Sequence, residues 1–386
     1  MKDSELLIVT YDRYPNGNAG AVRQHIFAKA FMDMGFIVNL IGMGENTDFK
    51  YKDYEGVSYI SLRNKKKDFI NKVLTKLLYK KRLKKAMSKF SPDVIMVVDL
   101  PLSVMNYTRK YAKKTGATLI HDSVEWYSKE EFRWGGLDLT YIKKDIMNRK
   151  VINKDYNVIA ISEYLRNHFD LRGIKTCRIP FVQDVKNIVV EKNLSDGKFV
   201  IVYAGSMGKK DYFDSIITAL TKLDKKLLEK IELRIIGSNK TLFLKYSGID
   251  EGLLDKLGDS VKFFGRIPRE KVLENLKQAN FTIIIRPEDL RYAKAGFPTK
   301  VTESLSYGTP VIANLTSDLA WYLEDGYNSV IVKGSDAESV KRALEKTLAY
   351  SQEQLIQMCE NARKTAEEKL DYRLFMKEIK SVCEKG

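Results

Sequence analysis

The stretch Ala295-Gly-Phe-Pro-Thr-Lys-Val-Thr-Glu-Ser-Leu-Ser-Tyr-Gly-Thr-Pro-Val-Ile-Ala-Asn314 predicts a loop, a short helix and a buried strand in succession. Glycine and proline interrupt its first residues, a helix is expected over 299–306, and Gly308 separates that helix from an apolar run. Where a loop leads into a helix, unpaired backbone N–H groups and the positive end of the helix dipole suit a diphosphate. Glu303, inside the helix, would then accept hydrogen bonds from a ribose diol. An ordinary connection between a helix and a strand is the alternative.

Strand and helix patterns alternate along most of the chain. In the first half, apolar runs typical of strands fall at 6–10, 38–41, 57–62, 94–98, 117–121 and 158–161. Helical patterns lie between them, at 21–34 and 102–115. From residue 199 onward the alternation starts again, and the tail from 352 to 383 reads as helical throughout. Strands that alternate with helices favour doubly wound parallel sheets, so we expect an α/β protein.

The chain divides into two domains by length and pattern. Its 386 residues are too many for one compact domain and suit two of ordinary size. Residues 183–197 show no clear period, and we expect them to be a linker. This places an N-terminal domain at 1–182 and a second domain at 198–366. The last helix, at 367–386, is expected to pack back on the first domain.

Basic residues outnumber acidic ones, and the formal net charge is +16. Twelve of the lysines and arginines lie between Arg63 and Lys89, against Asp68 alone, and apolar residues recur among them at helical spacing. Such an amphipathic helix is typical of an element that lies on an anionic membrane. A surface helix whose apolar stripe packs on the core is the alternative. The candidate membrane-binding residues are Lys72, Lys76, Lys80, Lys81, Arg82, Lys84 and Lys85.

Several function classes find no support in the sequence. No recognition-helix pattern or zinc finger is present, so we expect no nucleic-acid partner. There is no P-loop, no histidine and carboxylate spacing for a metal, and no catalytic cysteine or nucleophile elbow. We therefore expect no metal and no cofactor. No apolar run of about 18 residues occurs, and residues 1–10 lack the pattern of a secretory signal, so a cytoplasmic protein is expected.

Two candidate ligand-binding features follow strands of the first half. Gly17 and Gly20 lie between the strand at 6–10 and the next helix, where glycine lets a backbone approach a ligand closely. A tight turn that simply needs glycine is the alternative. His121 ends the strand at 117–121, within reach of a ligand, although a strand-end histidine is often only hydrogen-bonded inside the protein.

Cations follow two strands of the second half. Lys209 and Lys210 come a few residues after the strand at 199–203, together with Gly205. Glycine N–H groups and ammonium charges at such a place suggest phosphate binding, and a solvated turn is the alternative. Arg286 follows the strand at 281–285 and would add a second cation at the same edge of the sheet.

The order of several motifs carries a family resemblance. Val202-Tyr-Ala-Gly205, Phe263-Phe-Gly265, Ala279-Asn-Phe281 and the segment from Glu303 to Ile312 follow one another as in the retaining nucleotide-sugar glycosyltransferases of family 4, the group 1 enzymes. The chain resembles these enzymes most closely over 199–332 and more weakly in its first half. The resemblance implies the GT-B fold, in which two Rossmann-like domains face each other across a cleft.

The resemblance also implies roles for individual residues. His121 would hydrogen-bond the donor sugar, while Lys210 and Arg286 would stabilise the leaving diphosphate. These three form the expected catalytic set. Donor binding is expected at Gly17, Gly20, Gly205, Lys209, Gly265, Arg266, Gly296, Thr299, Lys300 and Glu303.

The same resemblance indicates a hexose or deoxyhexose transferred from a nucleoside-diphosphate sugar. Together with the basic helix it suggests a lipid-linked glycan acceptor, as in capsule or O-antigen assembly, and an enzyme at the inner face of the cell membrane. Three positions depart from the family pattern. Ala295 and Ser206 replace a glutamate and an arginine, and Asp211 stands where the family usually has its lysine, which puts Lys210 forward instead. A nucleotide-sugar epimerase of the same fold, or a catalytically idle nucleotide-sugar-binding protein, are therefore the other classes considered.

Overall fold

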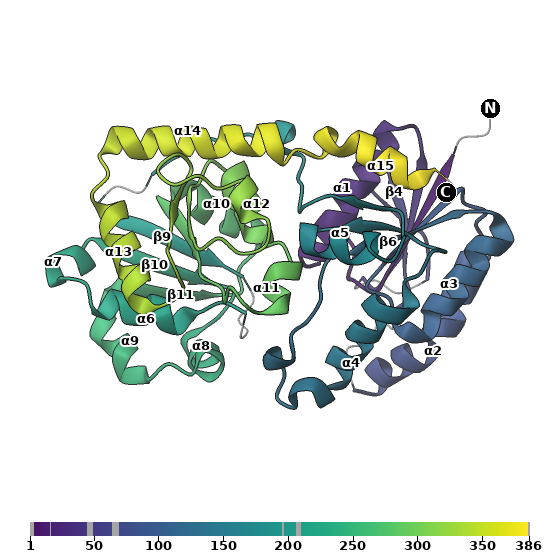
Figure 1. The fold of residues 1–386 in the computed structure, drawn as a ribbon, viewed down its shortest axis with the longest axis horizontal. Coiled ribbons are helices and arrows are strands. Elements are labelled where there is room, and N and C mark those ends of the chain that lie inside the picture. The colour runs from purple at the N-terminus through teal and green to yellow at the C-terminus, as the bar shows by residue number, and fades with distance from the viewer. Residues whose placement is uncertain are drawn as a thin grey trace. The chain divides into compact units, whose positions relative to one another are not determined.

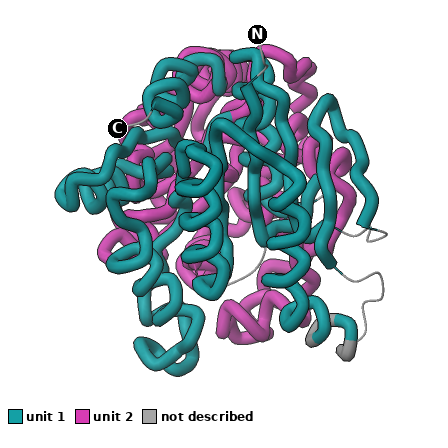
Figure 2. The backbone as a smooth tube through the Cα atoms, turned by 90° about the vertical axis from the view of Figure 1, so that its right-hand side faces the viewer, with its two compact units in different colours: residues 1–182, 372–386 teal, residues 183–371 magenta. Residues whose placement is uncertain are grey.

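The computed structural model describes residues 4–15, 17–44, 49–63, 69–194, 197–205 and 210–384, apart from the side chains of 69, 70, 72 and 73. Two compact units make up the chain. Unit 1 comprises residues 1–182 and 372–386, and unit 2 comprises residues 183–371 (Figure 2). Each unit is built on its own sheet, and Figure 1 labels the elements.

The sheet of unit 1 has the strand order β3-β4-β2-β1-β5-β6-β7-β8. All neighbours are parallel except β3, which pairs with β4 in the antiparallel sense. From Leu6 onward, β1 is buried at every residue, as expected of a parallel strand with both faces covered. The strands are β1 (Glu5–Thr10), β2 (Ile37–Gly42), β3 (Lys52–Tyr54), β4 (Val57–Ser61), β5 (Val94–Val98), β6 (Thr118–Ser123), β7 (Asn157–Ala160) and β8 (Thr176–Arg178).

Helices cover this sheet. Asn18 begins α1 by accepting hydrogen bonds from the N–H groups of Gly20 and Ala21. A buried ion pair of 2.9 Å between Arg23 of α1 and Asp122 of β6 fastens that helix to the sheet. The helices of unit 1 are α1 (Ala19–Asp33), α2 (Phe69–Met87), α3 (Leu102–Thr115), α4 (Leu139–Ile146), α5 (Glu163–Asp170) and α15 (Met376–Cys383).

The sheet of unit 2 is wholly parallel, with the strand order β11-β10-β9-β12-β13-β14. Numbered from β9, this is the Rossmann order 3-2-1-4-5-6, whose direction of winding reverses between β9 and β12. Ligands of such sheets bind beyond the carboxyl ends of the strands at that reversal. The strands are β9 (Phe199–Ala204), β10 (Ile231–Ile236), β11 (Val261–Gly265), β12 (Phe281–Ile284), β13 (Val311–Ala313) and β14 (Ser329–Ile331).

Apolar side chains on both faces of this sheet form the core of unit 2. Ile201 and Tyr203 of β9 belong to one cluster, and Val200 and Val202 belong to another, because successive strand residues face opposite sides. The helices are α6 (Phe213–Thr221), α7 (Lys225–Leu228), α8 (Lys240–Ser247), α9 (Glu251–Leu257), α10 (Arg269–Gln278), α11 (Arg291–Ala295), α12 (Thr299–Ser306), α13 (Ala337–Leu348) and α14 (Gln352–Lys369).

The structure corrects the expectation of one continuous C-terminal helix over 352–383. α14 ends at Lys369, and Leu370 and Asp371 are fully buried in a break before α15. Leu370 accepts a hydrogen bond from the N–H of Gln183, and the carboxylate of Asp371 accepts one from the N–H of Lys186. The first contact takes the carbonyl of Leu370 away from helical pairing, and the second holds the Asp371 side chain, so the two together fix the break.

The described part of the expected linker belongs to unit 2. The ammonium group of Lys192 donates hydrogen bonds to the carbonyl oxygens of Leu276 and Ala279 and to the hydroxyl of Thr309. Burial lowers the pKa of Lys192 to about 8. Residues 183–194 therefore pack against α10 and the start of β13, and the chain passes between the units at 182/183 and 371/372.

Candidate functional site

Three glycines lie at the carboxyl ends of the adjacent strands β9, β10 and β11 in unit 2. The N–H of Gly205 donates to the carbonyl of Ile236, and the N–H of Gly237 donates to the carbonyl of Gly265. A Cβ atom at Gly237 would lie 2.2 Å from the carbonyl oxygen of Gly205, so only glycine fits there. Gly237 was not singled out in the sequence, although it follows an apolar run just as Gly205 does. The three glycines therefore bring the backbone segments at these strand ends close together.

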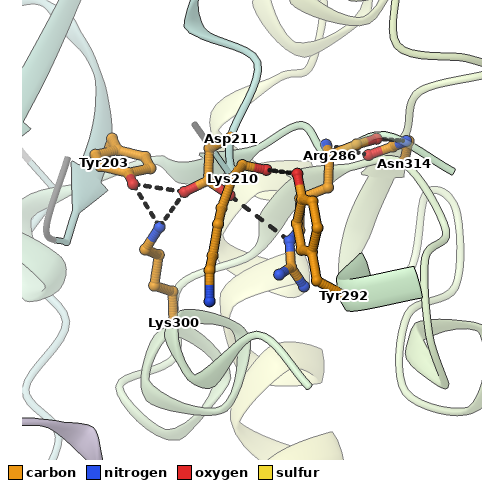
Figure 3. A network of polar contacts seen from close by, with 7 residues as sticks. All are labelled: Tyr203, Lys210, Asp211, Arg286, Tyr292, Lys300 and Asn314. Atoms are coloured by element: carbon orange, nitrogen blue, oxygen red, sulfur yellow. Dashed lines mark hydrogen bonds and ion pairs between the residues drawn. The ribbon is translucent and has the colours of Figure 1, made fainter. Parts of the chain in front are cut away.

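Beside these glycines, Lys300, whose side chain is 24% exposed, forms an ion pair with buried Asp211 (Figure 3). The ammonium group of Lys300 also donates to the hydroxyl of Tyr203 at 2.6 Å, and that hydroxyl donates to Asp211. Burial alone would raise the pKa of Asp211, but the charges of Lys300 and Arg286 hold it below its usual value. Asp211 and Tyr203 were not predicted as site residues, because the sequence shows neither the ion pair of Asp211 with Lys300 nor the hydrogen bond of Tyr203 to both.

Arg286 approaches the same carboxylate from the end of β12. Its Nε lies 3.7 Å from Asp211 Oδ1, and its Nη1 is buried with no hydrogen-bond partner among the described residues. The amide of Asn314 clamps the backbone of Arg286 by accepting from its N–H at 2.9 Å and donating to its carbonyl at 2.7 Å. A buried guanidinium with an unused donor is costly unless a ligand supplies an acceptor.

Lys210 completes the group of cations. Its carbonyl accepts a hydrogen bond from the hydroxyl of Tyr292, whose ring lies 5.9 Å from the Lys210 ammonium and 5.4 Å from the guanidinium of Arg286. Figure 3 shows the Lys210 and Arg286 side chains extending toward the same side of the network. Lys300 and Arg286 thus both lie against the carboxylate of Asp211, with Lys210 close to Arg286, and a group of cations suits a diphosphate.

The helix α12 begins next to this cluster. Pro298 precedes it and no side chain caps its first N–H groups, which leaves its amino end as predicted for an anion site. Glu303 lies farther along the helix, 18% exposed, and its carboxylate pairs with Arg269 at 2.9 Å. Thr299 and Gly296 lie at the start of this segment. Ala295, the departure from the family pattern, is fully buried.

In unit 1, His121 lies inside β6 and is only 2% exposed. Asp122 faces Arg23 of α1, so the histidine ring faces the opposite side of the sheet. Neither ring nitrogen has a hydrogen-bond partner among the described residues. Burial, with the nearby charge of Lys144, lowers the pKa of His121 to about 3, and the ring is therefore neutral at physiological pH.

Comparisons with known proteins identify the family. Residues 184–366 match the family of glycosyl transferases group 1. An uncharacterized glycosyltransferase of Methanocaldococcus jannaschii is 22% identical over 287 residues, which are 72% of this chain and 69% of the relative. Unit 2 therefore belongs to the group 1 glycosyltransferase family. This agrees with the family that the sequence motifs indicate.

Solved glycosyltransferases share the fold. Sucrose-phosphate synthase of Thermosynechococcus elongatus superposes with a TM-score of 0.76 at 14% identity, covering 98% of both chains. WaaG, a glycosyltransferase involved in lipopolysaccharide biosynthesis, superposes with a TM-score of 0.69 at 16% identity. The match covers 99% of this chain and 100% of the WaaG chain. HepE of Anabaena in complex with UDP superposes with a TM-score of 0.65 at 14% identity. The match covers 97% of this chain and 98% of the HepE chain. The two parallel-sheet domains of this glycosyltransferase thus have the GT-B fold.

The structure places the remaining predicted donor-site residues of this glycosyltransferase as follows. Gly265 adopts φ +63°, which favours glycine, and Arg266 beside it is exposed. A Cβ atom at Gly17 would lie 2.0 Å from a carbonyl oxygen of its own loop, so the loop itself already requires glycine there. Lys209 and Ser206 lie outside the described residues.

The basic helix α2 exposes both lysine side chains and apolar side chains to solvent. Leu74 and Leu77 are 40% and 72% exposed, while Tyr79 and Leu83 are buried. Arg82 differs from its neighbours, because its guanidinium donates to the carbonyl of Leu62 at 3.1 Å. Lys76, Lys80, Lys81, Lys84 and Lys85 are exposed, and the side chain of Lys72 lies outside the description.

The described residues lack two further features. No group of three or more histidine, cysteine, aspartate or glutamate side chains there could hold a metal ion. In the same part of the chain, none of the helices combines the length and the apolar character that crossing a membrane requires.

Proposed function

We propose that this group 1 glycosyltransferase transfers a hexose or 6-deoxyhexose, with retention at the anomeric carbon, from a nucleoside-diphosphate sugar to a lipid-linked glycan acceptor. The observation that carries the proposal is the cluster of Lys300, Arg286 and Lys210 beside the three strand-end glycines of unit 2. Its buried, unused guanidinium donor fits a diphosphate oxygen. HepE, which shares the fold, was solved with UDP and with UDP-glucose, and this supports a nucleotide-sugar donor.

The proposed chemistry uses the leaving group itself as the base. The acceptor oxygen forms a bond to the anomeric carbon while the bond from that carbon to the diphosphate oxygen breaks. The electron pair leaves with the diphosphate, and the acceptor proton passes to a phosphate oxygen. Lys300, Arg286 and the N–H groups at the start of α12 stabilise the developing negative charge, so the step calls for no metal ion.

Other residues would bind the ribose, the base and the sugar of the donor. Glu303 would hold the ribose hydroxyls, and the backbone near Gly265 and Arg266 would contact the base. His121, neutral and buried, would hydrogen-bond the donor sugar, which gives its unused ring nitrogens a partner. Loss of one phosphate-binding cation is expected to cost about 2–3 kcal/mol of binding or transition-state stabilisation.

The proposal of a lipid-linked acceptor rests on basic and apolar side chains that unit 1 exposes. The exposed lysines of α2 flank exposed Leu77, a combination that suits an anionic lipid surface at about 1 kcal/mol per basic residue. Unit 1 also exposes the apolar side chains of Trp134 (69%), Leu137 (82%) and Leu139 (67%). WaaG acts in lipopolysaccharide biosynthesis and supports a role in cell-surface glycan assembly, such as capsule or O-antigen synthesis.

A thermal-shift panel of nucleoside diphosphates and nucleotide sugars tests the proposal, followed by assay of diphosphate release with and without membrane extract. Selective stabilisation with release that depends on the extract would support the transferase and identify the donor. Conversion of the donor sugar without any acceptor would indicate an epimerase. Stabilisation without turnover would indicate an idle binding protein, and stabilisation by none of the panel would overturn the donor site.

A further inference from the structure

One exposed carboxylate of unit 2 is fixed close to Arg286. Glu288 lies two residues after that arginine, in the segment that follows β12. Its Oε1 accepts a hydrogen bond of 3.2 Å from the amide of Asn314, which is only 1% exposed. The same amide clamps the backbone of Arg286, as Figure 3 shows. A single buried side chain therefore holds both the cation and the carboxylate.

The segment that follows Asn314 has unused hydrogen-bonding groups. Thr316 is 4% exposed, and its Oγ1 has no hydrogen-bond partner among the described residues. The Oγ of Ser317 is buried and lacks a partner in the same part of the chain, and Ser317 adopts φ +52°. The left-handed conformation costs free energy for a residue other than glycine, and so does an unpaired buried hydroxyl. Costs of both kinds at one point are typical of a segment that binds a ligand.

The sign of the charge decides which part of a nucleotide-sugar donor fits Glu288. The cations Lys300, Arg286 and Lys210 attract phosphates, whereas an exposed carboxylate repels them and accepts hydrogen bonds from hydroxyl groups. The diphosphate joins the ribose, for which Glu303 is proposed, to the sugar that is transferred. A second carboxylate beside the diphosphate cations therefore fits the hydroxyl groups of that sugar.

Neighbouring positions do not supply such a carboxylate. Ala295, where the family pattern has a glutamate, is fully buried, and its methyl side chain cannot accept a hydrogen bond. Asp289 is exposed, and its side chain makes no hydrogen bond to any of the described residues. Glu288 differs from both, because Asn314 gives its carboxylate a defined position.

We propose that Glu288 determines the specificity for the donor sugar: it accepts hydrogen bonds from the hydroxyl groups of an uncharged hexose or 6-deoxyhexose and repels the carboxylate of a uronic acid. The unused hydroxyls of Thr316 and Ser317 are available to the same sugar. This inference rests on the proposed function, because it names the class of sugar that the donor carries. Glu288 is a binding residue here, and the acceptor proton still passes to the leaving diphosphate.

Calorimetric titration of the full chain tests the proposal. The probes are UDP, UDP-glucose and UDP-glucuronate, together with GDP, GDP-mannose and GDP-mannuronate. Glu288→Ala is expected to weaken binding of the neutral nucleotide sugar about tenfold, because a sugar hydroxyl loses its charged acceptor. Binding of the nucleoside diphosphate alone should change less than about twofold, since the cations that hold it remain.

Glu288→Gln provides a readout that a merely structural role would not move. The natural protein is expected to bind the uronate at least about tenfold more weakly than the neutral nucleotide sugar, because two carboxylates repel each other. The variant removes one of those charges and keeps the size of the side chain, so its affinity for the uronate should rise. Asp289→Asn is the matched control, because it removes the same charge one residue away.

Each result bears on a separate claim. The inference is wrong if the natural protein binds a uronate as tightly as the neutral nucleotide sugar, or if Glu288→Gln behaves like Asp289→Asn. Equal losses for the diphosphate and the nucleotide sugar in Glu288→Ala would also overturn it, because Glu288 would then act only through Asn314 and Arg286. If the natural protein binds none of the six nucleotides, the proposed function itself fails, and this inference fails with it.

Discussion

The side chain of Lys300 passes directly over the backbone of Gly205, so that a Cβ atom at position 205 would lie 2.4 Å from Lys300 Cε. Position 205 must therefore be glycine for the Lys300 side chain to fit. This glycine lets the lysine at the start of α12 reach Asp211 and Tyr203. The ion pair in turn holds a cation at the carboxyl edge of the sheet, next to Arg286.

Gly205→Ala is expected to displace Lys300 and to weaken binding of the nucleoside diphosphate about tenfold, which corresponds to about 1.4 kcal/mol. Gly136→Ala is a suitable control, because the nearest atom to a Cβ atom there is 4.0 Å away. Calorimetric titration of both variants measures the difference. Equal affinities for the two variants would show that the position of Lys300 does not matter for the diphosphate.

Asp211→Asn is expected to destabilise the free protein by about 3–5 kcal/mol, because it leaves Lys300 and Arg286 buried without a counter-charge. A bound diphosphate supplies negative charge, so the increase in Tm on adding it should be larger in the variant than in the natural protein. Differential scanning calorimetry with and without the diphosphate tests both parts. A smaller increase in the variant would mean that the ligand does not contact these cations.

His121 predicts a specific dependence of stability on pH. Its pKa is about 3 in the folded protein and near 6.5 when unfolded, so the unfolded chain binds more protons between these values. The free energy of unfolding should therefore fall as pH decreases from 6.5, with a limiting slope of about 1.4 kcal/mol per pH unit. Denaturation of the natural protein and of His121→Gln from pH 7.5 to 4.5 measures this contribution as a difference in slope. Parallel curves would contradict a neutral, buried His121.

Glu303→Ala is expected to raise the KM for the donor strongly, because the ribose diol loses its acceptor. The structure adds a control, since Glu303 also pairs with Arg269. Arg269→Ala removes that pair while keeping the carboxylate, and it should change the KM for the donor much less. Steady-state kinetics with varied donor separates the two effects. An unchanged KM in Glu303→Ala would refute the proposed role.

Reversal of three exposed lysines of α2, Lys76→Glu, Lys80→Glu and Lys84→Glu, is expected to weaken binding to anionic liposomes at least about 100-fold. The control changes Lys225, Lys226 and Lys256 of unit 2 to glutamate, which alters the net charge equally. Co-sedimentation with vesicles of varied anionic lipid content measures both triple variants. If the two bind alike, or if lipid charge has no effect, α2 is not the membrane-binding surface.

The sequence by itself determined the α/β class and most strand and helix positions. Apolar runs such as 94–98 are fully buried strands, and the helices expected at 102–115 and 299–306 have those bounds in the structure. These elements are periodic over their whole length, and periodicity reflects which face is buried. The three-residue strands β3 and β8 were missed, because neither contains an apolar run such as that of three-residue β13.

Only the tertiary structure decided which residues meet. Asp211, Tyr203, Asn314 and Gly237 lie in separate stretches, and their roles come from contacts with Lys300, Arg286 and Gly205 that no local pattern encodes. The break between α14 and α15 likewise depends on Gln183, nearly 190 residues away in the chain. Local propensity sets the elements, whereas the winding of each parallel sheet sets which strand ends, and hence which side chains, become neighbours.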